Sequence, residues 1–439
     1  MPASNRTARR RLPVTSAALL SLLTLSLTAP AAAFADGSPT ASPTATATGT
    51  PTATLSATPP SGMSTIGGDR LGSPGTQVNL GSGAPVIPKD ITARSWIVAD
   101  AESGDVLAAH NAHWRLPPAS TLKMLFADTL LPKFPRNTEH KVVPSDLAGM
   151  GAGSSVVGIK ENETYTVHDL WLGVFLRSGN DAVHVLSAMN KGVDQTVKDM
   201  QEHATELQAL DTHVVSPDGY DAPRQVSSAY DLTLFARSGL QKKDFREYCA
   251  TVRAQFPGET TKKKGKTTRG SFEIQNTNRL LAGDSDVTPY QGIAGVKNGN
   301  TSNAGATFTG VAERNGKVLL VTVMNPEKNE HNEVYKETAK LLDWGFGAAD
   351  KVTPVGELVA PQGTDTSAQP GANAPVSPGA GAGKESAKPV ATGLKDGGSR
   401  GVGIALAVAG GVLVLLVAGG FLVNRRWPLP DLVRRRTRR

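Results

Sequence analysis

The chain has 439 residues, 39% of them hydrophobic, and a formal net charge of +7 at pH 7. Four arginines near the N-terminus contribute +4, and a C-terminal tail with seven arginines and one aspartate contributes +6. The residues between them therefore carry a net charge of about −3. The basic balance therefore gives no support to nucleic-acid binding. The single cysteine, Cys249, excludes an intrachain disulfide.

Residues 1–35 have the pattern of a secretory signal peptide. A basic segment ends at Arg11, an apolar run follows, and small residues ending in Ala33-Phe34-Ala35 provide a cleavage site. An uncleaved anchor is the alternative, but the apolar run is short for a bilayer. Residues 36–85 are rich in Ser, Thr, Pro and Gly, and this composition predicts a disordered stalk. We therefore expect an exported chain.

Residues 86–354 read as one globular unit. It opens with the two apolar runs of residues 94–110, joined at Ser103-Gly104, which predict a β-hairpin. It closes with residues 304–324, where Asn315-Gly316 between two β-prone runs is a strong hairpin signal. A further strand is expected at residues 292–299, and a closing helix at 334–346.

Between these strand groups the pattern is mostly helical. Thr166-x-x-Asp169 resembles a capping box before an apolar helical face, and residues 193–210 and 231–240 also read as helices. The basic run 261–269 lacks the glycine spacing of a phosphate-binding loop and is predicted to be a solvated loop. The predicted fold class is α/β (α+β): one antiparallel sheet of about five strands, flanked by helices, with an inserted, mostly helical region.

The C-terminal part predicts membrane attachment. Residues 355–400 are again rich in small and polar residues and are expected to form a disordered linker. Residues 401–423 contain no charge and are long enough to span a bilayer as a helix. The arginine-rich residues 424–439 then form a cytoplasmic tail by the positive-inside rule, which places the globular unit outside the cell.

The stretch LPPASTLKMLFA, residues 116–127, places a lysine among apolar residues. Two prolines favour a helix that starts near Pro118, so Ser120 would lie in the first turn and Lys123 on the same face. Desolvation would favour a neutral amine, which can accept the proton of a nucleophilic serine. An exposed lysine near a helix start explains the same pattern when it stands alone.

Two further motifs follow in the chain. Ser178-Gly179-Asn180 stands at the junction of two apolar helices, where a hydroxyl can relay a proton and an amide can hold a peptide group. A helix-capping turn is the alternative interpretation. In GVKNGNTSNAG, Lys297 ends a strand and offers a cation to an anionic group of a substrate, while Gly299 permits close backbone approach.

In this order, STLK, SGN and KNG resemble the S-x-x-K, S-x-N and K-T-G motifs of the serine D-Ala-D-Ala carboxypeptidases among the low-molecular-weight penicillin-binding proteins. The similarity extends from about Thr92 to Trp344. It implies the DD-peptidase and β-lactamase-like fold, with removal of the terminal D-Ala from peptidoglycan stem peptides. β-Lactams would be inhibitors that mimic the same dipeptide, and the resemblance implies no cofactor and no metal.

The resemblance also implies roles for individual residues. Ser120 would be acylated, Lys123 would be the general base, Ser178 would assist proton transfer and Asn180 would hold the substrate amide. The substrate-binding residues would be Lys297, which helps to bind the terminal carboxylate, together with Asn298, Gly299 and Asn300. The backbone N–H groups of Ser120 and Asn300 would form the oxyanion hole.

One residue departs from the family pattern, because Asn298 stands where the family has threonine. This substitution keeps a non-catalytic or weakly active penicillin- or cell-wall-binding protein open as an alternative, and on the sequence alone Asn298→Thr is predicted to raise turnover. A serine β-lactamase is a further alternative, but the helical region has no E-x-x-L-N pattern for a deacylating carboxylate.

Overall fold

The computed structural model describes residues 58–363, which form an antiparallel sheet with helices on both faces. The strands lie in the order β1 (Thr76–Val78), β3 (Asp105–His110), β2 (Ala93–Asp100), β10 (Lys317–Pro326), β9 (Gly305–Arg314) and β8 (Ile293–Thr301). The short β11 (Gly356–Glu357) also pairs with β3. Strands from both ends of the unit therefore share one sheet, as predicted, with two short strands added to the expected five.

The predicted hairpins set the register of the sheet. Asn315 and Gly316 both have positive φ, 53° and 77°, and Lys317 pairs directly with Arg314. This is the backbone that a two-residue hairpin turn requires. On β2, Ile97 and Ala99 belong to one hydrophobic cluster, whereas Trp96 and Val98 belong to another. The two-residue period thus buries both faces of the sheet.

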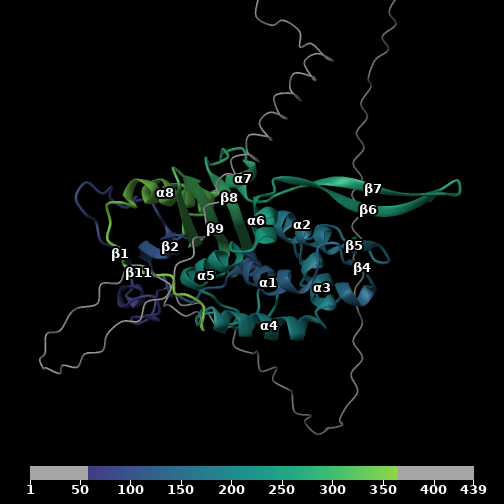
Figure 1. The fold of residues 1–439 in the computed structure, drawn as a ribbon, viewed down its shortest axis with the longest axis horizontal. Helices are drawn as coiled ribbons and strands as arrows, with labels where there is room; N and C mark the ends of the chain where they lie inside the picture. Colours follow the sequence, from purple (N-terminus) through teal and green to yellow (C-terminus); the bar gives the residue numbers. More distant parts are fainter. Residues whose placement is uncertain (1–57, 364–439) are drawn as a thin grey trace, which may run out of the picture. The chain divides into compact units, whose positions relative to one another are not determined.

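Helix α8 (Glu333–Ala348) packs on β10, β9 and β2, and its Leu341, Leu342 and Trp344 are buried with Trp96 and Val98. The other face carries the inserted helical region (Figure 1), in which α5 (Ala229–Gly239) packs on β10 and on α1 (Lys123–Leu130). The helices of that region are α1 (Lys123–Leu130), α2 (Val167–Arg177), α3 (Asn180–Met189), α4 (Val193–Glu206), α5 (Ala229–Gly239), α6 (Lys243–Ala250) and α7 (Arg279–Ala282).

Short elements connect these helices and strands. The predicted capping box at the start of α2 is confirmed: Asp169 N donates to Thr166 Oγ1 at 3.1 Å, and Thr166 N donates to Asp169 Oδ2 at 3.0 Å. The remaining elements are η1 (Asp69–Gly72), η2 (Ala119–Leu122), η3 (Leu131–Lys133), η4 (Pro144–Leu147), β4 (Glu139–Lys141) and β5 (Thr164–Thr166).

The basic run 261–269 is not a loop, so that prediction was wrong. It lies in a long hairpin of β6 (Arg253–Lys263) and β7 (Lys266–Gln275), with positive φ at Lys264 and Gly265 in the turn. The β-branched threonines on both sides of the lysines favour extended backbone. Figure 1 shows the hairpin projecting beyond α2. Because it interrupts the helical region, that region is less purely helical than expected.

The folded unit is also longer than the predicted 86–354. Residues 58–85, assigned to the stalk, include η1 and β1, and Leu71 is 1% exposed. At the other end Tyr230 Oη donates to Glu357 O at 2.8 Å, which fixes β11. These segments fold because apolar side chains and sheet pairing offset the entropy lost on ordering. The predicted signal peptide, the rest of the stalk, most of the linker, the span 401–423 and the tail lie outside the described residues.

Within residues 58–363, none of the helices combines the length and apolarity needed to cross a bilayer.

Candidate active site

Ser120 lies in η2, directly before α1, where the backbone is held by a neighbouring strand. Thr307 Oγ1 on β9 donates to Pro118 O at 2.9 Å, and Ala119 has a φ of 50°, which is uncommon for a residue with a side chain. The predicted α-helix begins at Lys123, so Ser120 stands in a 3₁₀ turn before it. Strained backbone of this kind is concentrated at functional sites.

Lys123 is 1% exposed, and its amine reaches the serine. Lys123 Nζ lies 2.8 Å from Ser120 Oγ and 2.7 Å from Asn180 Oδ1, and it also donates to Asp218 O. Burial lowers the pKa of Lys123 to about 8, although the charges of Asp218 and Asp181 act in the opposite direction. A substantial fraction of the amine is therefore neutral near physiological pH and able to accept a proton.

Ser178 and Asn180 lie at the junction of α2 and α3, as predicted. Ser178 caps α2 with a φ of 55°, which turns the chain so that Asn180 begins α3. Asn180 bonds Lys123 through its oxygen and Ser154 Oγ through its nitrogen, at 3.0 Å. The junction therefore serves as a helix cap and also delivers two polar side chains to the site.

Lys297 on β8 is also 1% exposed and forms the second half of the site. Its Nζ lies 3.0 Å from Ser178 Oγ and 2.7 Å from Asn298 O. Burial, and then the nearby charge of Lys123, hold the pKa of Lys297 well below its usual value. The charge of Lys123 thus disfavours a charge on Lys297.

Asn298 is held by a residue that the sequence motifs did not single out. Thr277 Oγ1 donates to Asn298 Oδ1 at 2.9 Å, and Lys297 Nζ lies 3.5 Å from the same oxygen. Thr277 is itself fixed, because its N–H bonds Leu176 O at 2.9 Å and Tyr335 Oη bonds its carbonyl at 3.1 Å. The amide oxygen of Asn298 is therefore turned toward these donors.

Gly299 and Asn300 complete the predicted set. A Cβ at Gly299 would lie 2.7 Å from Ser120 N, so the edge strand β8 reaches the nucleophile only because this residue has no side chain. Asn300 is exposed and lines a pocket of about 450 Å³ together with Ser120, Ser154 and Asn180. Of the eight predicted site residues, Ser120, Asn180 and Asn300 line this pocket. Lys123 and Gly299 contact Ser120 behind it, and Ser178 and Asn298 both lie within hydrogen-bond distance of Lys297.

The loop after α4 supplies residues that sequence reasoning missed. Gly219, with a φ of 79°, packs so closely on η2 that a Cβ would lie 2.0 Å from Ala119 O. Asp218 accepts bonds from Ser216 Oγ and Tyr220 N, and its carboxylate lies 3.6 Å from His184. Burial opposes its charge, but His184 and Lys123 lower the pKa of Asp218 overall. The Asp218-Gly219 pair was the available signal for a tight turn.

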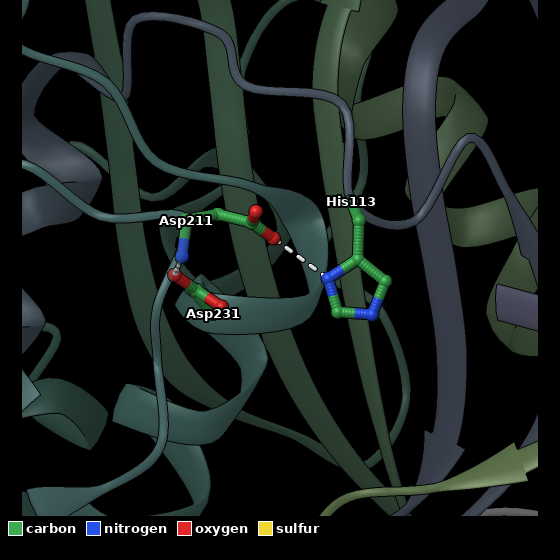
Figure 2. Close-up of side chains that lie close together, drawn as sticks. All are labelled: His113, Asp211 and Asp231. Carbon is green, nitrogen blue, oxygen red and sulfur yellow. Dashed lines mark hydrogen bonds and ion pairs between the residues drawn. The ribbon is translucent and has the colours of Figure 1, made fainter. Parts of the chain in front are cut away.

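Figure 2 shows a second buried polar cluster, which shares no residue with the first. His113 Nδ1 lies 2.6 Å from Asp211 Oδ2, and Asp231 Oδ2 accepts from Asp211 N at 2.9 Å. His113 Nε2 lies 3.0 Å from Ile66 O, and Arg115 Nε bonds Asp211 Oδ1. The 2.6 Å separation is that of a hydrogen bond, and two ligands of one zinc ion would stand farther apart. We therefore interpret this cluster as a structural one.

Comparison with known proteins gives the family. Residues 82–328 match the model of the D-alanyl-D-alanine carboxypeptidase family Peptidase_S11. The chain is 36% identical to D-alanyl-D-alanine carboxypeptidase DacB2 of Mycobacterium tuberculosis over 280 residues, covering 63% of this chain and 89% of the relative. It is 31% identical to DacD of Escherichia coli over 271 residues, covering 59% of this chain and 64% of the relative.

Solved structures agree on the fold. The crystal structure of a D-alanyl-D-alanine carboxypeptidase from Mycobacterium tuberculosis H37Rv aligns with a TM-score of 0.55 at 33% identity, covering 63% of this chain and 99% of that one. The crystal structure of the Streptomyces K15 DD-transpeptidase aligns with a TM-score of 0.54 over 60% of this chain and 99% of that one, and its 24% identity supports the fold alone. The chain belongs to the serine-type D-alanyl-D-alanine carboxypeptidase family.

Proposed function

We propose that this chain is an active D-alanyl-D-alanine carboxypeptidase that removes the terminal D-Ala of peptidoglycan stem peptides and is inhibited by β-lactams. The observation that carries the proposal is the buried Lys123 amine, with a pKa of about 8, at 2.8 Å from Ser120 Oγ. A nucleophile and a base at this distance, beside an open pocket, form the minimal machinery for acyl transfer.

In the proposed mechanism Ser120 Oγ attacks the penultimate D-Ala carbonyl while Lys123 Nζ accepts its proton. The backbone N–H groups of Ser120 and Asn300 stabilise the oxyanion. Collapse of the tetrahedral intermediate breaks the peptide bond, and terminal D-Ala leaves after its nitrogen takes up a proton, with Ser178 assisting the transfer. Water then attacks the acyl-enzyme, and Ser120 regains its proton. Asn180 orients the substrate amide throughout.

The substrate carboxylate is assigned to the Lys297 side of the site. Because Thr277 and Lys297 both face the oxygen of Asn298, the amide nitrogen is left to donate toward the substrate. We assign Thr277 as a positioning residue that lets an amide act where the family uses a hydroxyl. On this basis Asn298 is an adapted residue of an active enzyme.

Membrane attachment remains part of the proposal. The sequence of residues 401–423 supports a single span, and residues 1–35 support export, so the site would face the exterior of the cell membrane. A protein anchored in this way would act on newly made stem peptides close to the membrane surface.

The competing function is a penicillin- or cell-wall-binding protein with little turnover, and the observation that favours it is Asn298 itself. To separate the two, the purified chain is incubated with a pentapeptide that ends in D-Ala-D-Ala, and free D-alanine is measured against Ser120→Ala. We expect release that depends on Ser120. Labelling by fluorescent penicillin without D-alanine release would instead establish the binding function, and failure of both would reject the proposal.

A further inference from the structure

The tip of the β6–β7 hairpin carries Lys262, Lys263, Lys264 and Lys266, which we call the lysine tip. Every residue from 259 to 273 is exposed. Among residues 58–363 no acidic side chain forms an ion pair with any of these four lysines, whereas Arg253 and Arg269 nearer the base both have acidic partners. The lysine tip is therefore a concentrated positive charge that the described fold does not neutralise.

The strand register brings these charges closer together. Lys263 pairs directly with Lys266, and Lys262 and Lys264 flank the pair on the same turn. Like charges directly opposite each other on paired strands destabilise the pairing. The arrangement thus costs folding free energy and returns no contact within the described protein. A negatively charged binding partner would offset the repulsion, so that the clustered lysines would stabilise the complex.

The base of the hairpin is fixed, so the lysine tip is held in place. Glu163 accepts from Thr260 Oγ1 at 2.8 Å and lies 3.6 Å from Arg269 Nε, while the Arg269 guanidinium stacks 4.7 Å from the centre of the Tyr165 ring. Tyr165 stacks in turn on Phe256 at 5.6 Å. These contacts join the hairpin to β5 and to Glu163 just before it. Because Arg269 takes part in them, its charge does not belong to the lysine tip.

The chemistry of the tip selects the kind of anion. Residues 259–271 include no aliphatic or aromatic side chain, so nothing there can insert into the apolar part of a membrane. Free arginine, whose planar fork matches both carboxylate and phosphate, is also missing from the tip, so ammonium groups alone carry the positive charge there. What remains is lysine ammonium groups flanked by the hydroxyls of Thr261, Thr267 and Thr268. Ammonium point charges with hydroxyl donors are suited to phosphate oxygens.

We infer that the lysine tip is a docking surface for a linear polymer that carries repeated phosphate groups. Such a partner neutralises several lysines at once, and no residue of the lysine tip lines the pocket at Ser120. Docking at this surface does not depend on the proposed peptidase chemistry, because no residue of the lysine tip belongs to the site around Ser120.

The test measures binding of the purified full-length chain, in a nonionic detergent, to sodium polyphosphate. One variant changes Lys262, Lys263, Lys264 and Lys266 to glutamine. The matched control changes four other exposed lysines to glutamine and loses the same net charge: Lys89, Lys191, Lys243 and Lys351. We expect affinity at low salt to fall at least tenfold in the tip variant and less than threefold in the control. The slope of log affinity against log salt should become shallower by about 3 in the tip variant only.

Two further measurements keep the outcome interpretable. Fluorescent penicillin labelling should be unchanged in the tip variant, and the thermal unfolding midpoint should stay the same or rise because the repulsion between the lysines is removed. Both results show that the fold persists, and they separate this test from any failure of the peptidase proposal. Equal losses in both variants would reduce the effect to net charge and overturn the inference. A tip-dependent interaction with micelles that contain anionic phospholipid, without polyphosphate binding, would overturn it in favour of a membrane contact.

Discussion

Two buried polar clusters within residues 58–363 differ in what completes them. In the cluster of Ser120, Lys123 and Asn180, the serine and the asparagine border an open pocket. In the cluster of His113, Asp211 and Asp231, each residue is at most 4% exposed. Ile66 O bonds the second ring nitrogen of His113, and Arg115 bonds the second carboxylate oxygen of Asp211. Similar burial therefore supports chemistry at the cluster that borders a pocket and cohesion at the cluster whose contacts are all within the protein, where only Asp231 Oδ1 has no hydrogen-bond partner among the described residues.

The two clusters should respond in opposite ways to substitution. Removal of a group beside the pocket should lower the rate with little loss of stability. Removal of a group from the closed cluster should lower stability and leave the chemistry of the surviving folded molecules unchanged.

The largest expected effect is that of Ser120→Ala. Loss of the nucleophilic oxygen should reduce acylation by fluorescent penicillin more than about 10³-fold, because no other group can form the acyl-enzyme. The unfolding midpoint should stay close to that of the wild type. Residual labelling that survives denaturation and maps to another residue would remove Ser120 from the proposed role.

Lys123→Met tests the base. The substitution preserves much of the apolar stem and removes the amine, so we expect acylation to fall by about 10² to 10⁴-fold. Because a buried amine carries a desolvation cost, stability should be maintained or increased. Measurement of the acylation rate together with the urea unfolding midpoint checks both parts. A variant that unfolds more easily and acylates normally would assign Lys123 to the structure instead.

The closed cluster is tested by His113→Ala, with the exposed His331→Ala as the control. Loss of the imidazole leaves Asp211 without one of its hydrogen-bond partners and Ile66 O without a donor. A buried carboxylate that loses a partner in this way costs about 3 kcal/mol of unfolding free energy. The control should change stability by less than about 0.5 kcal/mol. An acylation rate that falls while the unfolding free energy is unchanged would contradict the assignment.

The pH dependence of acylation reports the state of Lys123. Its pKa is lowered to about 8 by burial, so the neutral amine becomes scarce as pH falls. The rate should rise about tenfold per pH unit below pH 7 and level off above about pH 9. Stopped-flow labelling between about pH 6 and pH 9.5 measures this profile. A rate that is flat across the range would show that deprotonation of Lys123 does not limit acylation.

The smallest effects are expected at Thr277 and Asn298. Thr277→Val should lower kcat/KM for the pentapeptide about fivefold, mainly through KM, and Thr277→Ser should restore it. Because Thr277 bonds Asn298, we now expect Asn298→Thr to lower activity about threefold, opposite to the expectation from sequence alone. A double-mutant cycle checks the coupling. Strictly additive effects would mean that Thr277 does not act through Asn298.

Much of the secondary structure of this protein could be predicted from local sequence signals. The apolar, β-prone runs that form β2, β9 and β10, the Asn315-Gly316 turn and the Thr166–Asp169 capping box each specify short-range geometry, and the structure confirms them. The spacing of Ser120 and Lys123 brings the two side chains within hydrogen-bond distance along one turn. These features depend on residues that are neighbours in the chain, so their residue types alone indicated the outcome.

Tertiary structure decided the contacts between distant residues. The bond from Thr277 to Asn298, the packing of Gly219 against Ala119 and the folding of residues 58–85 onto the sheet each join segments that are separated in sequence. No local pattern specifies such pairs, because their stability comes from burial and register that exist only once the sheet and the helical region have formed. The same reason applies to the pKa of Lys123, which its neighbours in space set.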